Sequence, residues 1–198
     1  MRVVVVSAGL SVPSSTRILA DQLAAATVAA VHEPVEVDVV ELRPLAHALA
    51  DNLLTGFPSG DLAEAVETVR RADAMIAVTP VFSASYSGLF KTFFDVLEKD
   101  LLDGMPVLIG ATAGTARHSL VLEHALRPLF TYLHATVVPT AVFAASEDFG
   151  EPGLEARVER AAAELAAMLS GTQRQRRSRS TGDAFADPTP FEELLRGA

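Results

Sequence analysis

The sequence predicts an α/β domain in which helices cover both faces of a parallel β-sheet, and three observations support this. Short apolar runs alternate along the chain with longer segments in which apolar residues recur at helical spacing. The joints between these segments are short. The apolar runs are rich in β-branched residues, as in Val3-Val4-Val5-Val6, which is typical of a strand buried on both faces. Strands and helices that alternate in this way form parallel sheets.

Five strands and five helices can be placed in order along the chain. The expected strands are residues 3–6, 35–42, 74–78, 106–110 and 136–143. The expected helices span residues 61–71, 88–101, 120–133 and 154–169, together with a first helix over about residues 15–26. Residues 45–60 are rich in Pro, Gly and Asn, so we expect a surface loop there. Its possible anchors are Leu45, Leu49, Leu53 and Leu54.

Five strands in this arrangement predict the flavodoxin-like winding. This is a three-layer, doubly wound, five-stranded parallel sheet with the strand order 2-1-3-4-5. Ligands of such sheets bind outside the carboxyl ends of the central strands. The loops that follow the first, third and fourth expected strands begin near Gly9, Thr79 and Ala111, so these loops should form the site.

Composition narrows the class of protein. The 198 residues suffice for one domain with an appendage, and the formal net charge of −9 disfavours nucleic-acid binding, since a phosphate backbone would be repelled. The chain has no cysteine, which excludes disulfides and thiolate catalysis. No apolar run approaches the length of a bilayer span, and no signal peptide precedes the first strand. We therefore expect a cytoplasmic protein that has no membrane partner.

The first loop joins a buried strand to a helix and is dense in hydroxyl groups. Gly9 permits a tight exit from the strand because it has no Cβ. The hydroxyls and the free backbone N–H groups of a helix's first turn suit a phosphate group. The candidate phosphate ligands are Ser11, Ser14, Ser15, Thr16 and Arg17. Ser and Thr at a helix start are also ordinary N-caps, and this alternative stays open.

The second and third loops combine side chains that suit a flat ligand. From Thr79 to Asp95 the second loop and the start of the next helix mix aromatic rings with hydroxyls, which fits a partly apolar ring that also forms hydrogen bonds. From Ala111 to Ser119 the third loop is built of small residues, which let backbone groups approach a ligand edge. Either loop alone could be a turn with an N-cap, Ser87 in one case and Ser119 in the other.

Together the three loops resemble those of the NAD(P)H-dependent FMN reductase family. The segment from Thr79 to Lys91, T-P-V-F-S-A-S-Y-S-G-L-F-K, is similar to the family signature T-P-x-[YF]-x-x-S-x-x-G-x-[LF]-K, and the resemblance covers roughly residues 1–170. It implies that the first loop holds the FMN phosphate through the five candidates named above. It implies isoalloxazine contacts from Pro80, Val81, Phe82, Ser83 and Ser85. It implies contacts to the pyrimidine edge from Thr112, Ala113 and Gly114.

The resemblance implies an FMN-dependent NAD(P)H oxidoreductase that transfers hydride from NADPH or NADH to flavin. The cofactor carries such chemistry, so no catalytic side chain is expected, and Arg117 is a candidate contact for the phosphates of the nicotinamide cofactor. Two alternatives stay open: a quinone or azo-compound reductase with bound FMN, and a non-enzymatic electron carrier of flavodoxin type. The implied partners are a small-molecule flavin or quinone acceptor, a separate monooxygenase, and further copies of the chain in a homodimer or homotetramer.

Composition changes sharply after Gly171, which divides the chain into three parts. Residues 1–171 are the expected FMN-binding reductase domain. Residues 172–182 are a basic linker that carries four arginines and no acid between Gln173 and Ser180. Residues 183–198 are an apolar arm, which we expect to dock on the body or on a partner subunit. Its apolar residues include Phe185, Phe191, Leu194 and Leu195.

Overall fold

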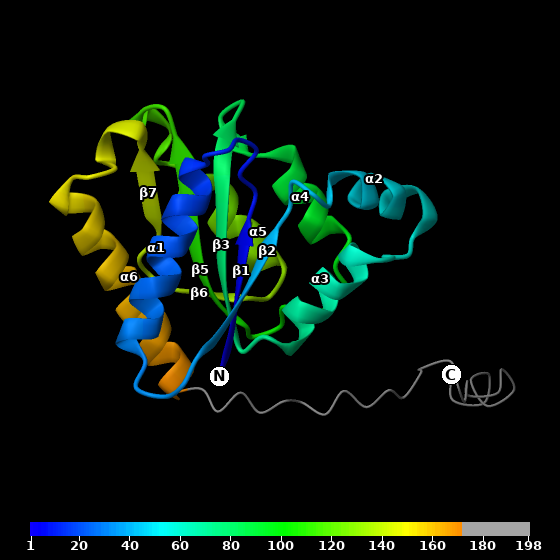
Figure 1. Ribbon diagram of the computed structural model, residues 1–198, viewed down its shortest axis with the longest axis horizontal. Coiled ribbons are helices and arrows are strands. Elements are labelled where there is room, and N and C mark those ends of the chain that lie inside the picture. The colour runs from blue at the N-terminus through cyan, green and yellow to red at the C-terminus, as the bar shows by residue number, and fades with distance from the viewer. Residues whose placement is uncertain (172–198) are drawn as a thin grey trace, which may run out of the picture.

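A computed structural model describes residues 1–171 as a parallel sheet with helices on both faces (Figure 1). The strands are β1 (Arg2–Ser7), β2 (Glu36–Glu41), β3 (Ala74–Phe82), β4 (Ser85–Tyr86), β5 (Pro106–Ala113), β6 (Thr136–Val137) and β7 (Val142–Ala145). The α-helices are α1 (Ser15–Ala30), α2 (Ala46–Thr55), α3 (Asp61–Arg71), α4 (Gly88–Asp95), α5 (Arg127–Tyr132) and α6 (Pro152–Gly171). The shorter turns are η1 (Ala116–His118), η2 (Leu122–Leu126), which is π-helical, and η3 (Ser146–Asp148). The predicted linker 172–182 and arm 183–198 lie outside the described residues.

The sheet has the predicted winding. Its order is β2-β1-β3-β5, all parallel, and β6 and β7 both pair with β5 as two pieces of the expected fifth strand. The order 2-1-3-4-5 is therefore confirmed. The short strand β4 pairs antiparallel with the end of β3 and forms a hairpin beyond the main sheet.

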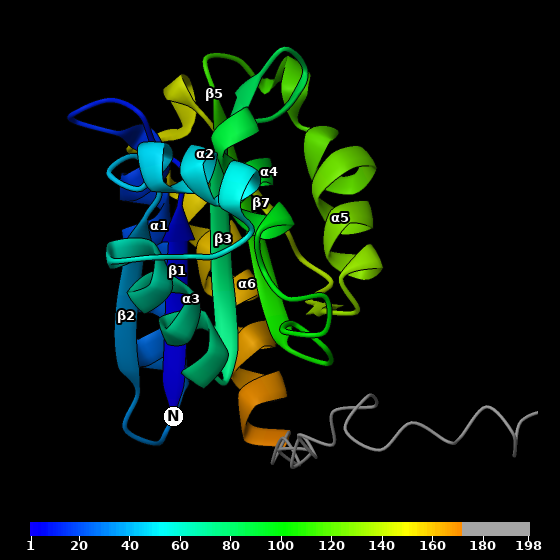
Figure 2. The ribbon, with the colours of Figure 1, turned by 90° about the vertical axis from the view of Figure 1, so that its right-hand side faces the viewer.

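Side chains that alternate along the strands separate two apolar layers. Val3 and Val5 of β1 pack in the layer that holds α1 and α6, whereas Val4 and Val6 pack with α2, α3, α4 and η2 on the other face (Figure 2). The second layer contains the aromatic residues of α4, and the Phe94 ring lies 4.7 Å from that of Phe90, between ring centroids. The apolar stripe of α4 is thus part of the core.

Polar contacts anchor the amino-terminal end of β1. The backbone N–H of Arg2 donates to Oδ2 of Asp73 at 2.8 Å, and the Arg2 guanidinium pairs with Glu36 at 2.9 Å. The terminal ammonium group of Met1 donates to the carbonyl of Pro34 at 3.0 Å. These contacts tie the start of β1 to the segments that lead into its two neighbours, β2 and β3.

The prediction of a loop over residues 45–60 was wrong, because residues 46–55 form α2. Leu45 and Leu49 are both buried, and their spacing of four residues is helical. The helix ends at Gly56, whose φ of 80° is a left-handed C-cap. Breaker residues are concentrated only from Gly56 onwards. Leu53 and Leu54 are exposed and do not serve as the expected anchors.

The expected fifth strand, residues 136–143, is divided into β6 and β7 around Pro139. Proline has no N–H for the ladder, so pairing stops there. Neighbouring side chains form hydrogen bonds with the backbone groups that the break leaves unpaired. The guanidinium of Arg127 donates to the carbonyls of Val138 and Pro139, both at 3.0 Å. The Glu164 carboxylate accepts from the backbone N–H of Thr140 at 2.6 Å and from its hydroxyl at 2.7 Å.

Two predicted helices are shorter or less regular than expected. The helix expected over residues 88–101 ends at Asp95. The helix expected over residues 120–133 consists of a π-helical turn followed by α5, and Pro128 falls in the first turn of α5. Since proline in a helix interior lacks the donor for an i→i−4 bond, a single regular helix through residue 128 is disfavoured.

Candidate functional site

The three candidate loops lie at one edge of the sheet. Strands β1, β3 and β5 are parallel neighbours, so their carboxyl ends share this edge, where the loops after β1 and β3 rise together (Figure 1). Pro80 of the second loop is in register with Thr112 of the third. The structure therefore brings together the candidate residues of all three loops.

The first loop presents unpaired donors at the start of α1. Ser14 is the N-cap, and its Oγ accepts from the backbone N–H of Arg17 at 3.2 Å. The backbone N–H groups of Ser15 and Thr16 have no partner within residues 1–171, as expected for a helix's first turn. The side chains of Ser11 and Ser15 are exposed. The loop therefore offers hydroxyls and N–H groups at the positive end of the helix dipole.

Gly9 is required by the close packing of this loop. A Cβ at Gly9 would lie 2.1 Å from Oγ of Ser14 and 3.0 Å from its Cβ. Any larger residue would therefore displace the capping serine and, with it, the first turn of α1.

Arg17 is held by two carboxylates. Its Nε lies 2.7 Å from Oδ1 of Asp21, and its Nη1 pairs with Glu41 of β2. The hydrogen bond to Asp21, opposed by partial burial and reinforced by Glu41, raises the pKa of the Arg17 guanidinium. The side chain keeps its charge, but neighbouring acids offset that charge. The assignment of Arg17 to a phosphate stays a prediction.

The second loop is a tight β-hairpin rather than an open loop. The positions Val81 and Phe82 pair with Tyr86 and Ser85. The two turn residues between the strands, Ser83 and Ala84, have φ values of 49° and 66°. Positive φ at both central positions is typical of two-residue hairpin turns, which favour Asn or Gly there. Ser83 and Ala84 are neither Asn nor Gly, so the backbone strain in this conformation is roughly 1–3 kcal/mol at each of them.

Thr79 and Ser87 fix the base of this hairpin. The buried Thr79 hydroxyl accepts from the backbone N–H of Ser87 at 3.0 Å and donates to the carbonyl of Pro80 at 2.9 Å. Ser87 caps α4, because its Oγ accepts from the N–H of Phe90 at 3.2 Å. The N-cap expected at Ser87 is confirmed. No role was predicted for Thr79, although a hydroxyl residue at the end of an apolar strand indicates a buried polar contact there.

The third loop is joined to the first by a buried hydrogen bond. The hydroxyls of Thr16 and Thr112 lie 2.8 Å apart, and both residues are 2% exposed. The hydroxyl of Thr16 is therefore already used, which leaves its backbone N–H for a ligand. Ala113 and Gly114 follow, and Gly114 has open space where a Cβ would stand. Small residues beside open space let a planar ligand approach the backbone.

Beyond Gly114 the third loop carries exposed polar residues. Arg117 lies in η1 and is exposed, with no ion pair to the acidic groups of residues 1–171. Ser119, the second possible N-cap, instead follows η1, and the next helical turn begins at Leu122 without a side-chain cap. The N-cap expected at Ser119 is therefore wrong.

These residues fit FMN. A phosphate needs hydroxyl and N–H donors, and the start of α1 supplies them beside a glycine-tight turn. An isoalloxazine needs an apolar wall and a backbone edge. The half-exposed Phe82 and the Ala113-Gly114 backbone are placed to provide these. No group of His, Asp or Glu that could hold a metal ion occurs within residues 1–171. Within the same residues, no helix is long and apolar enough to span a bilayer.

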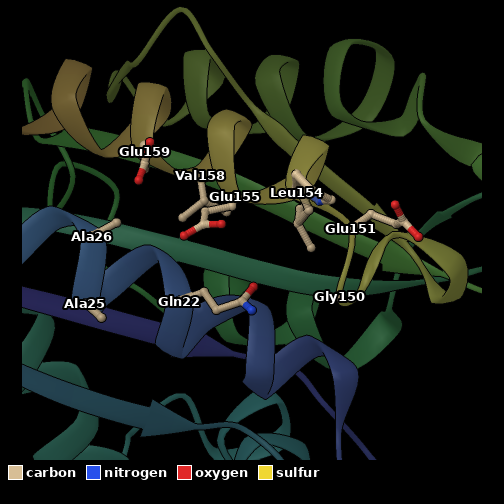
Figure 3. Close-up of a pocket in the computed structure, with 10 residues that line it drawn as sticks. Gln22, Ala25, Ala26, Gly150, Glu151, Leu154, Glu155, Val158 and Glu159 are labelled. Carbon is tan, nitrogen blue, oxygen red and sulfur yellow. The ribbon is translucent and has the colours of Figure 1, made fainter.

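A second concave region lies away from these loops. A groove of about 490 Å³ runs between α1 and the start of α6 (Figure 3). None of the candidate FMN ligands lines this groove.

Comparison with known proteins identifies the family of this chain. The profile of the NADPH-dependent FMN reductase family matches residues 1–150. An FMN reductase (NADPH) of Pseudomonas aeruginosa is 39% identical over 176 residues, covering 86% of this chain and 92% of that protein. The NADH-dependent FMN reductase SfnF of Pseudomonas fluorescens is 38% identical over 178 residues, covering 87% and 93%.

A solved structure gives the same result. The crystal structure of an oxidoreductase of Corynebacterium diphtheriae is 48% identical to this chain and superposes with a TM-score of 0.84, covering 86% of this chain and 97% of that one. The fold agrees with the family profile, which spans most of the described domain. The chain belongs to the NADPH-dependent FMN reductase family.

Proposed function

We propose that this chain reduces flavin with NAD(P)H, the activity of its family, at the edge formed by its three loops. The observation that carries this placement is the Thr16–Thr112 hydrogen bond, because it couples the helix start that suits a phosphate to the loop that suits a flavin ring. When bound, FMN supplies the position that accepts hydride from the nicotinamide. The protein supplies position and electrostatics.

Each loop has a separate task in this proposal. The N–H groups of Ser15 and Thr16, with the Ser11 and Ser15 hydroxyls, bind the phosphate. The β3–β4 hairpin would hold the flavin ring and shield one side of it from water. The backbone N–H groups after Thr112 would bind the pyrimidine edge of the ring and favour a negatively charged flavin there.

The nicotinamide cofactor approaches from the solvent side, where Arg117 is exposed. A guanidinium without an acidic neighbour among residues 1–171 is available for a phosphate or pyrophosphate group. The two relatives described above are named for different nicotinamides, one for NADPH and one for NADH. Both are therefore proposed donors, and Arg117 is the proposed contact for either.

The proposed partners are the ones that the sequence predicts. A free flavin or a quinone is the small-molecule acceptor, and a separate monooxygenase is the user of reduced flavin. A homodimer or homotetramer and a cytoplasmic location remain predictions of the same kind.

The test is binding followed by turnover. Purified full-length protein should bind FMN more tightly than riboflavin, because only FMN carries the phosphate. It should then oxidise NADPH or NADH when free flavin or a quinone is supplied. Equal affinity for FMN and riboflavin would remove the phosphate assignment. Tight FMN binding without nicotinamide oxidation under any acceptor would instead indicate an electron carrier.

A further inference from the structure

The groove between α1 and α6 has an apolar floor and an acidic wall. The floor consists of Ala25 and Ala26 of α1 with Leu154 and Val158 of α6. Three carboxylates also line the groove, four residues apart: Glu151 directly precedes α6, and Glu155 and Glu159 lie in its first turns. The side chains of Glu155 and Glu159 lie on the side of α6 that faces α1, with Gln22 opposite them (Figure 3).

The acidic wall has no basic counterpart in the described domain. No lysine or arginine lines the groove, and none within residues 1–171 forms an ion pair with its three glutamates. The nearby Arg157 and Arg160 are committed to Asp148 and Glu164 instead. An arginine-rich segment matches such a groove, since arginine stems cover apolar surface while their charged ends reach a carboxylate rim.

We propose that residues 173–180 of the same chain bind in this groove, so that the basic linker folds back along α6. The segment begins two residues after Gly171, the last residue of α6, and carries four arginines with no acid. It is thus tethered at one end of the helix whose other end forms the acidic wall. This proposal is independent of the flavin assignment.

The reach of the linker selects which arginines meet which glutamates. Glu159 stands twelve residues before Gly171, about 18 Å along the helix axis, and Glu155 about 24 Å. An extended chain advances about 3.3 Å per residue. Reversing direction after Gly171 uses about two residues, and the long arginine side chain makes up this length. Arg177 then reaches the level of Glu159, and Arg179 that of Glu155. Arg174 is too close to the tether to reach either.

The spacing of the arginines along the linker also matches the spacing of the glutamates along α6. Residues two apart on an extended chain lie on the same side, about 6.6 Å apart. Residues four apart on a helix lie about 6 Å apart along its axis. Arg177 and Arg179 therefore pair in step with Glu159 and Glu155, while Arg176 points to the opposite side. This difference provides a matched control inside the segment.

Cross-linking can test the contact without background, because the chain has no cysteine. Gln22→Cys in the groove is combined with Thr181→Cys, which follows Arg177 and Arg179 on the same side of an extended chain, in full-length protein and treated with a short bismaleimide. The control pair combines Thr181→Cys with Thr55→Cys, an exposed position on α2, which packs on the opposite face of the sheet. We expect cross-links within one chain to form faster with Gln22→Cys than with Thr55→Cys.

Charge variants then identify the contact. Arg177→Gln with Arg179→Gln should reduce the Gln22 cross-link by about two- to tenfold, as expected for two exposed ion pairs. Arg174→Gln with Arg176→Gln removes the same charge and should leave the rate nearly unchanged. Equal rates at the two cysteine pairs, equal effects of the two charge variants, or cross-links only between chains would each overturn the proposal.

Discussion

In two regions of this domain, backbone polar groups lie outside the regular hydrogen bonding of helices and strands, and their pairing differs. At the break between β6 and β7, side chains of neighbouring helices bind the carbonyls of Val138 and Pro139 and the N–H of Thr140. At the start of α1, the N–H groups of Ser15 and Thr16 have no partner in the described domain. The hydrogen bonds of the first region are formed within the protein and stabilise it, whereas the N–H donors of the second region are available to a ligand. Substitutions in the two regions should therefore fail in different assays.

The largest effect should come from Gly9→Ala in the ligand region. The new Cβ would overlap Ser14 Oγ at 2.1 Å, which displaces the N-cap and the donors beside it. Loss of charge-assisted hydrogen bonds of about 1.5–3 kcal/mol predicts FMN affinity about 10- to 150-fold weaker. Titration with FMN and with riboflavin measures it, and the riboflavin affinity should fall much less.

Gly88→Ala is the matched control for this substitution. Gly88 begins α4 and has nothing within 4 Å of where its Cβ would stand. FMN affinity should be unchanged. A similar loss from both substitutions would show that Gly9 acts through general stability and not through the phosphate site.

The next effect should come from Thr112→Val, which removes one partner of the buried hydroxyl pair. Leaving the Thr16 hydroxyl without a partner costs about 1–3 kcal/mol in the free energy of unfolding. Because the bond joins two loops, FMN affinity should fall as well. Thr112→Ser keeps the hydroxyl and should restore both. Denaturant unfolding and FMN titration of the three proteins measure the effect, and normal FMN affinity in Thr112→Val would refute the coupling.

Arg127→Met tests the break between β6 and β7, and this substitution should lower only the stability of the fold. It removes two hydrogen bonds to carbonyls and an ion pair with Glu123, a loss of about 1–2 kcal/mol in the free energy of unfolding. FMN affinity should stay within experimental error. Arg160→Met is the control, because Arg160 is 75% exposed and exposed ion pairs contribute little. A change in FMN affinity for Arg127→Met would contradict the division between the two regions.

The smallest effect concerns pH and Glu164. Partial burial favours the neutral carboxyl, but the hydrogen bonds from Thr140 and the Arg160 guanidinium together outweigh it and lower the pKa of Glu164. A group with a lowered pKa in the folded state stabilises the fold above its unfolded pKa of about 4.3, and this contribution is lost as the pH falls through the folded-state pKa.

Glu164→Gln should therefore be less stable than the parent protein by about 1 kcal/mol at neutral pH. The difference should shrink as the pH falls below about 4. Thermal melting of both proteins across this range measures it. A difference that stays constant with pH would show that the carboxylate charge plays no part.

The strand order and the location of the candidate site could be predicted because local patterns determine them. Apolar runs such as Val3–Val6 define parallel strands, and parallel strands put their loops on one edge. The helix α2 was missed although Leu45 and Leu49 have helical spacing, because the turn-forming residues after Gly56 dominated the composition of the segment.

Contacts between distant residues could not be predicted. Thr16 and Thr112 are separated by 96 residues, and only the register of three strands brings their hydroxyls together. Pro139 could have marked the break in the expected strand 136–143, but nothing local indicates that Arg127 and Glu164 bind the groups left unpaired there. The turn at Ser83-Ala84 lacks the glycine that marks such hairpins.

The polar anchors of β1 also favour one alignment among several that burial separates only weakly. Sliding Val3–Val6 by one residue replaces valine with valine at three of the four positions, so hydrophobic free energy discriminates weakly between the alignments. The N–H of Arg2 bound to Asp73 and the Arg2–Glu36 ion pair resolve this degeneracy. A slip would shift Gly9 and the start of α1 by about 3.3 Å and separate Thr16 from Thr112. Contacts at the far end of the strand thus set the alignment of the sheet edge that carries the three candidate loops.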